Sequence, residues 1–207
     1  LCILVIVMLN EKRKLAKELF LSRGAILKAK ILRENKFCSR EITELVDDGL
    51  IRKIKPGYYI WCEEENNLSD IETIASVLPY GIICRQTAAQ FHELTTVNPL
   101  AISIAIPANR TRVILPSHPP VELVPTSLAT FELGLTILKT DHMSIRIYDR
   151  ERTVCDFFRK RNQLGEDLAL EVLQNYMSGT RNLQRLFEYA GKLRIKLVIR
   201  PYVEALL

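Results

Sequence analysis

The stretch SREITELVDDGLIRKIKPGYYIW, residues 39–61, constrains the fold most because its hydrophobic period changes at one glycine. Before Gly49, the apolar residues Ile42, Leu45 and Val46 follow the i, i+3, i+4 spacing of an amphipathic helix. The serine that opens the stretch is a preferred N-cap residue, and Gly49 provides the left-handed position at which helices often end. We therefore expect a short helix that stops at Gly49.

After this glycine the pattern changes to a period of two. Residues 50–55 lead into a Pro-Gly pair and residues 58–61 return from it, which predicts a β-hairpin with a tight turn. Lys53 and Lys55 are two residues apart, so we expect both ammonium groups on one face of the hairpin. The chain thus places a small basic ribbon directly after a helix.

Two further amphipathic helices are predicted upstream, over residues 11–22 and 25–35. Three short helices followed by a basic hairpin are typical of the winged helix-turn-helix arrangement, which we assign to residues 9–62. In that arrangement the third helix enters the DNA major groove by its N-terminal residues, and the hairpin lies against the phosphates.

The positive charge of the chain is concentrated in this region. Residues 1–61 carry 13 Lys/Arg against 7 Asp/Glu, a balance of +6, whereas residues 62–207 carry 16 against 17. A basic domain of this kind is expected to bind a polyanion. Arg40 is placed to contact guanine and Thr43 a thymine methyl or a phosphate, whereas Glu44 repels the phosphates unless it accepts from a cytosine amino group. The predicted DNA contacts are Lys28, Lys30, Arg33, Ser39, Arg40, Thr43, Glu44, Lys53, Lys55 and Tyr58.

An acidic run at residues 63–67 is expected to be a linker, and residues 68–207 a second domain. This domain mixes strand and helix periods, and AISIAIP, residues 101–107, alternates as a strand does. The chain then ends in amphipathic helical segments. The predicted fold class is α+β, with a winged helix-turn-helix followed by a mixed α+β domain that ends in a helical segment. Further strands are expected at residues 81–84, 113–115, 121–124, 131–138 and 143–148.

The sequence contains no pattern that predicts catalysis, a metal or a cofactor. No carboxylate group is spaced with a lysine as a nuclease needs, the three histidines are unpaired, and no glycine-rich phosphate loop occurs. The five cysteines are scattered without a CxxC pair, which indicates reduced thiols in the cytoplasm. No apolar run is long enough for a membrane span, and the apolar start of the chain fits a signal peptide poorly. Met8 is a plausible natural start, which would make residues 1–7 an upstream read-through; the alternative is that these residues are an ordinary buried strand or the lead-in to a helix.

One dense polar cluster, YDRERTVCDFFRKR at residues 148–161, lies where a strand is expected to end and a helix to begin. Arg152 and Asp156 are four residues apart and are expected to pair on the helix surface. Two interpretations stay open here: a structural network that ties the helix to the sheet, or a binding surface for a partner. The residues of the cluster are Asp149 as a possible cap, Arg150, Arg152, Asp156 and Arg159.

The chain resembles the AbiEi antitoxins of bacterial abortive-infection, type IV toxin–antitoxin systems. The segments that carry the likeness are GAILKAKILRENKFCSREITELVDDGLIRKIKPGYYI, ICRQTAAQFHEL, ISIAIP, DRERTVCDFFRKR and NLQRLFEYAGKL. Together they extend over nearly the whole chain from about residue 9 onward. Compared with a typical recognition helix, the third helix of this chain is more acidic.

The resemblance implies an antitoxin in phage defence that represses its own operon by binding inverted repeats in double-stranded promoter DNA. Its partner would be a cognate nucleotidyltransferase toxin, which it counteracts without a stable complex. Two other functions stay open on the residues: a toxin-independent transcription regulator whose C-terminal domain senses a ligand, and a nuclease or transferase. The antitoxin and autorepressor is favoured over both alternatives, so we expect a protein that is not an enzyme.

Overall fold

The computed structural model of the chain describes the backbone of residues 2–110 and 112–207 and the side chains of residues 10–65, 67–110 and 112–207. The proposed start at Met8 falls outside the described side chains. Over the described residues the chain forms eleven α-helices and two sheets, so the α+β class is confirmed. The chain divides into two compact units, Leu1–Leu78 with Ile114–Pro119, and Pro79–Val113 with Pro120–Leu207.

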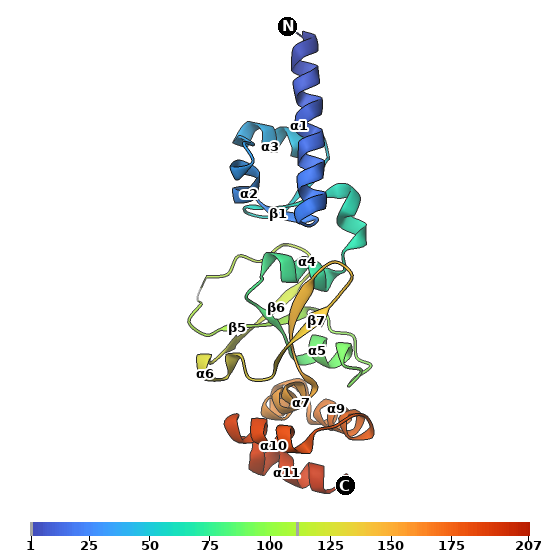
Figure 1. Cartoon of the computed structure of the whole chain (residues 1–207). Coiled ribbons are helices and arrows are strands. Elements are labelled where there is room, and N and C mark those ends of the chain that lie inside the picture. The colour runs from blue at the N-terminus through green and yellow to red at the C-terminus, as the bar shows by residue number, and fades with distance from the viewer. Residues whose placement is uncertain (1, 111) are drawn as a thin grey trace. The chain divides into compact units, whose positions relative to one another are not determined.

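The first unit packs helices over a small antiparallel sheet with the strand order β1-β3-β2 (Figure 1). Its core is apolar and includes Phe20 and Trp61, whose ring centroids lie 5.6 Å apart. The elements are α1 (Cys2–Arg23), β1 (Ile26–Lys28), α2 (Ala29–Glu34), α3 (Ser39–Asp47), β2 (Ile51–Lys55), β3 (Tyr58–Trp61), the 3-10 helix η1 (Cys62–Asn67) and α4 (Asp70–Val77).

The hairpin of β2 and β3 is confirmed, with Gly49 before it and Gly57 in its turn both at positive φ, +71° and +79°. The expected alternation within β2 is wrong, because the pairing register shifts between Lys53 and Lys55. The irregularity buries Ile51 and Ile54, three residues apart, so the two lysines do not share one face.

The segment at residues 25–35 is not one helix, as the sequence predicts, but strand β1 followed by α2. β1 pairs with the open edge of β3, and the Ala29 N–H donates to the Gly57 carbonyl at 2.8 Å. The hydrogen bonds that β3 offers therefore outweigh the helical pattern of these few residues. The acidic run at residues 63–67, expected to be an irregular linker, is part of η1.

The second unit is built on a mixed five-stranded sheet with the order β6-β5-β4-β8-β7. β4 lies at its centre, antiparallel to β5 and parallel to β8. The elements are β4 (Ile82–Ile83), α5 (Arg85–Phe91), β5 (Ile102–Pro107), β6 (Val121–Thr126), α6 (Leu128–Phe131), β7 (Leu135–Lys139), β8 (Ser144–Tyr148), α7 (Arg150–Arg159), α8 (Arg161–Leu164), α9 (Glu166–Ser178), α10 (Leu183–Lys192) and α11 (Lys196–Glu204).

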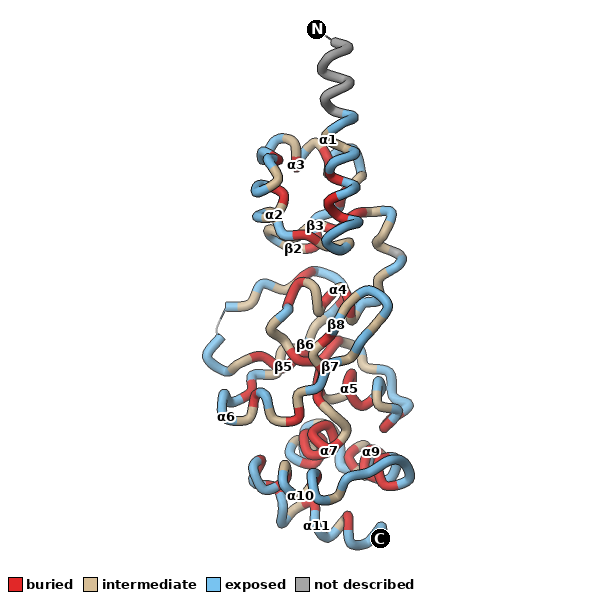
Figure 2. The backbone as a smooth tube through the Cα atoms, in the orientation of Figure 1, coloured by how far each residue is buried: buried red, intermediate tan, exposed pale blue. Residues whose placement is uncertain are grey.

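Two of the strands expected within residues 68–207 differ. Residues 113–115 form no strand, and the segment at 131–138 begins at the end of α6 and becomes extended only from Leu135. The helical end of the chain is confirmed, and α7, α9, α10 and α11 gather around one apolar cluster (Figure 1). Figure 2 shows that α7 is buried along most of its length, so this helix forms the centre of the group.

Candidate nucleic-acid interface

The N-terminus of α3 is capped by the residue before the predicted one. Cys38 is the N-cap, and the expected cap Ser39 is instead the first residue of the helix. The Cys38 N–H donates to the Glu41 carboxylate at 2.7 Å, and this bond lowers the pKa of Glu41. The Thr43 hydroxyl donates back to the Ser39 carbonyl at 3.0 Å, which leaves the Thr43 methyl as the free part of an exposed side chain.

Two neighbouring cations of α1 hold the two ends of α3. Lys12 Nζ lies 3.3 Å from a Glu41 oxygen near the start of α3 and donates to the Lys36 carbonyl at 3.0 Å. Arg13 Nη2 lies 2.6 Å from an oxygen of Asp48, which follows the last turn. Acidic groups at the C-terminal end of a helix are unfavourable, and Arg13 offsets one of them. Two of the acidic residues of this segment are therefore paired within the unit.

Arg40 and Glu44 form a pair one helical turn apart on the same helix. Arg40 Nε donates to Glu44 Oε1 at 2.9 Å, and the arginine side chain is 87% exposed whereas the glutamate side chain is 37% exposed. The arginine thus projects into solvent with one of its donors already used.

Around α3 and the hairpin lie cations that form no ion pair within the described part of the chain and are exposed. The predicted contact Lys30 is different, since its ammonium lies 3.8 Å from Glu34 in an exposed pair. Unpaired cations keep their full attraction for a polyanion. The exposed cations that form no ion pair in the described residues are Lys28, Arg33, Lys36 and Lys53.

The ammonium of Lys55, a predicted DNA contact, already has hydrogen-bond partners within the first unit. Its ammonium donates to the Val77 carbonyl at 2.8 Å and the Ile114 carbonyl at 3.2 Å, and it lies 4.5 Å from the centroid of the Tyr58 ring. Burial, with a smaller contribution from Lys28, lowers the pKa of Lys55. The two hairpin lysines therefore differ, since the Lys53 ammonium is exposed whereas that of Lys55 already has two carbonyl partners. The Lys28 ammonium also lies over the Tyr58 ring, 5.7 Å from its centroid.

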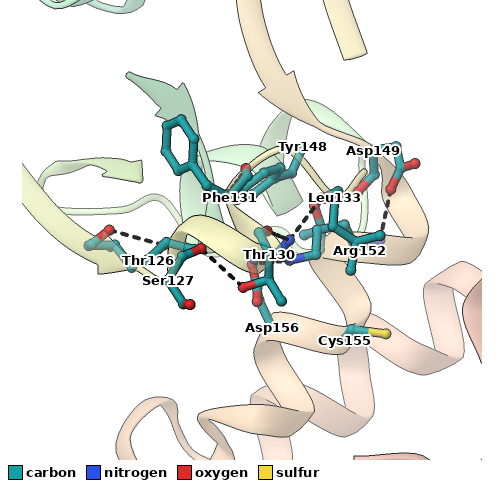
Figure 3. A network of polar contacts seen from close by, with 12 residues as sticks. Thr126, Ser127, Thr130, Phe131, Leu133, Tyr148, Asp149, Arg152, Cys155 and Asp156 are labelled. Atoms are coloured by element: carbon teal, nitrogen blue, oxygen red, sulfur yellow. Dashed lines mark hydrogen bonds and ion pairs between the residues drawn. The ribbon is translucent and has the colours of Figure 1, made fainter. Parts of the chain in front are cut away.

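The Arg152–Asp156 pair of the polar cluster is buried, which corrects the expected surface pair. Figure 3 shows the polar contacts around Arg152. The Arg152 side chain is 1% exposed, and its Nε donates to Asp156 Oδ2 at 3.1 Å. Its Nη1 donates to the Thr130 and Leu133 carbonyls at 2.7 and 2.8 Å, and its guanidinium lies 4.2 Å from the Tyr148 ring centroid. One arginine thus joins α7 to the segment between β6 and β7.

The other predicted members of the cluster have separate positions. Asp149 caps α7 as expected, accepting from the Arg152 N–H at 2.8 Å. Arg150 is half-buried and donates to the His92 carbonyl at 3.3 Å, whereas Arg159 is exposed at the end of α7. The cluster therefore fits the structural interpretation more closely than a partner surface.

Sequence reasoning missed three positioning residues. Lys12 and Arg13 hold the two ends of α3, and Gly134 lies against Arg152 in the polar cluster. The cations of α1 gave no signal, because their partners lie about 30 residues away. The burial of Arg152 and Asp156 has no signal in the sequence either, because Val154, Phe157 and Phe158 form a single apolar face and the carbonyl partners of Arg152 come from a distant segment.

No group of three or more His, Cys, Asp and Glu in the described residues is arranged to hold a metal ion. None of the helices in that part of the chain is both long and apolar enough to cross a membrane. Cys84 is buried, which raises the pKa of its thiol well above the usual value, and His92 Nε2 lies 2.7 Å from the Tyr148 carbonyl. Neither residue has the setting of an activated nucleophile or base. No family model and no curated protein matches the chain.

Proposed function

We propose that the first unit is a winged helix-turn-helix DNA-binding domain in which α3 is the recognition helix and the β2–β3 hairpin is the wing. The protein is then an autorepressor of its operon and the antitoxin of a type IV toxin–antitoxin system. The antitoxin role is supported by the resemblance of the sequence to AbiEi proteins, and we assign it to the second unit.

The observation that carries the DNA-binding proposal is the distribution of unpaired charge in the first unit. Glu41 and Asp48 are paired with α1, so the acidic character of α3 is partly neutralised within the protein. Lys28, Arg33, Lys36 and Lys53 are exposed and form no ion pair in the described residues, whereas Lys30 is paired with Glu34. Free cations beside an exposed helix N-terminus are what phosphate contacts require.

Binding to duplex DNA across a salt series tests the first half of the proposal. Counterion release makes the logarithm of the association constant fall with the logarithm of salt, with a slope of about −0.9 per neutralised phosphate. We expect a slope of several units on promoter DNA. A slope near zero, or no binding, would overturn the proposed role in repression.

Growth under co-expression tests the second half. A nucleotidyltransferase gene next to this one should arrest growth when expressed alone, and co-expression of the full chain should restore it. The alternative, a regulator that senses a ligand, gains support if the neighbouring gene encodes a metabolic enzyme and no toxicity is found.

A further inference from the structure

Glu44 is the residue of α3 that the proposed function explains least well. A carboxylate on a recognition helix that lies against DNA weakens binding by repulsion from the phosphates. Reading a cytosine amino group would give it a use, but Glu44 Oε1 already accepts from Arg40 at 2.9 Å. The position of this carboxylate is therefore better explained by what it does to the arginine.

The atom that Glu44 engages is the one that guanine recognition can spare. An arginine guanidinium has five N–H donors, one on Nε and two on each terminal nitrogen. Glu44 occupies Nε, and within the described residues both terminal nitrogens are left free on a side chain that is 87% exposed. Two parallel donors are what the O6 and N7 acceptors of guanine require.

Holding a long side chain also lowers the entropy lost when it binds. A free arginine has many rotamers, and each contact with a base must select one of them. The Glu44 carboxylate lies one turn further along the same helix and restrains the arginine before DNA arrives. This benefit depends on the arginine and is lost if the arginine is removed.

We propose that Glu44 is a positioning residue that presents the two terminal nitrogens of Arg40 to a guanine in the major groove. The inference rests on the proposed DNA-binding function and assigns Glu44 no base contact of its own. The carboxylate lowers affinity for DNA in general and raises the discrimination between sequences.

The test compares the wild type with Glu44→Ala, Glu44→Gln, Arg40→Ala and the double variant of Arg40→Ala with Glu44→Ala. Each full-length protein is used to select from a randomised duplex library, and its affinities for the selected duplex and for guanine-substituted duplexes are then measured. Arg40→Ala should lower the preference for one guanine by roughly 10- to 100-fold. Glu44→Ala should lower it by about 3- to 10-fold, with unchanged or tighter binding to unselected DNA. Glu44→Gln keeps an acceptor for Nε, so its guanine preference should lie between those of the wild type and Glu44→Ala.

The double variant distinguishes positioning from direct readout. In the Arg40→Ala background, Glu44→Ala should cause no further loss of discrimination. Glu34→Ala is the matched control, because Glu34 also belongs to an exposed i, i+4 pair of the first unit, with Lys30. This control should alter general affinity in the same direction and leave the base preference intact.

Three results would overturn the inference. Full guanine preference in Glu44→Ala would show that the arginine needs no positioning, and a loss at a different base pair that persists without Arg40 would show direct readout by Glu44. Failure of the wild type to bind any duplex would overturn the proposed function and this inference with it. The fluorescence of Trp61, the single tryptophan, reports whether each variant keeps the first unit folded.

Discussion

Gly134 shows how a single residue determines the packing around Arg152. It has a φ of +75°, and a Cβ added there would lie 2.5 Å from the Cβ of Arg152 and 2.9 Å from Asp149 Oδ1. Nonbonded atoms cannot lie this close to one another, so either α7 or the turn before β7 must move.

Gly134→Ala should therefore reduce the free energy of unfolding by about 2–4 kcal/mol, from left-handed backbone strain and overpacking together. Urea unfolding followed by circular dichroism measures this loss. Gly49→Ala is the matched control, because Gly49 has a φ of +71°, close to that of Gly134, but nothing within 4 Å of the added carbon. The control should show only the strain, about 1–2 kcal/mol. Equal losses in the two variants would contradict the role of close packing.

At the scale of elements, the sequence predicted those whose signals are local. The hairpin has its own turn residues and period, and the helices of the second unit have long apolar stripes, so both were found. β1 was missed because three residues become a strand only when β3 pairs with them. The acidic residues of α3 were recognised, but their partners were not, since Lys12 and Arg13 meet them only in the folded unit. Burial of Arg152 likewise depends on carbonyls from a distant segment.

The cap of α7 leads to a prediction about pH. Burial raises the pKa of Asp149, whose Oδ2 also accepts from the Tyr189 hydroxyl at 3.1 Å. A folded-state pKa above the unfolded value means that the folded protein gains its proton first as pH falls. The resulting stabilisation is complete below the unfolded pKa of about 3.9 and is lost as pH rises through the folded value.

Asp149→Asn keeps a capping side chain but removes this titration. The stability of the wild type relative to the variant should therefore increase as pH is lowered from 7 towards 4. Glu188→Gln gives the opposite sign, because the hydrogen bond from Lys192 at 2.6 Å lowers the pKa of Glu188. Its contribution is present at neutral pH and lost on acidification. Parallel urea titrations of the three proteins over this range provide the comparison, and a wild-type advantage over Asp149→Asn that shrinks on acidification would refute the assignment.

At the scale of the whole molecule, the chain passes between the two units more than once. The segment Ile114–Pro119 belongs to the first unit, although the residues on both sides of it belong to the second. Within the first unit, the ammonium of Lys55 binds a carbonyl of this segment and another at the end of α4. The hairpin is therefore held by residues that are 22 and 59 positions away in the sequence.

Lys55→Ala should thus act on stability rather than on contact with phosphate. Loss of two hydrogen bonds from a charged donor should lower the free energy of unfolding of the first unit by about 1–2 kcal/mol, as followed by Trp61 fluorescence. The salt slope of DNA binding should stay at the wild-type value. Lys53→Ala is the control on the same strand: its exposed ammonium has no ion pair in the described residues, so it should leave stability unchanged and reduce the slope by about 1. If Lys55→Ala reduces the slope while the first unit remains as stable as in the wild type, then Lys55 leaves its carbonyl partners to bind DNA, and the hairpin uses both lysines after all.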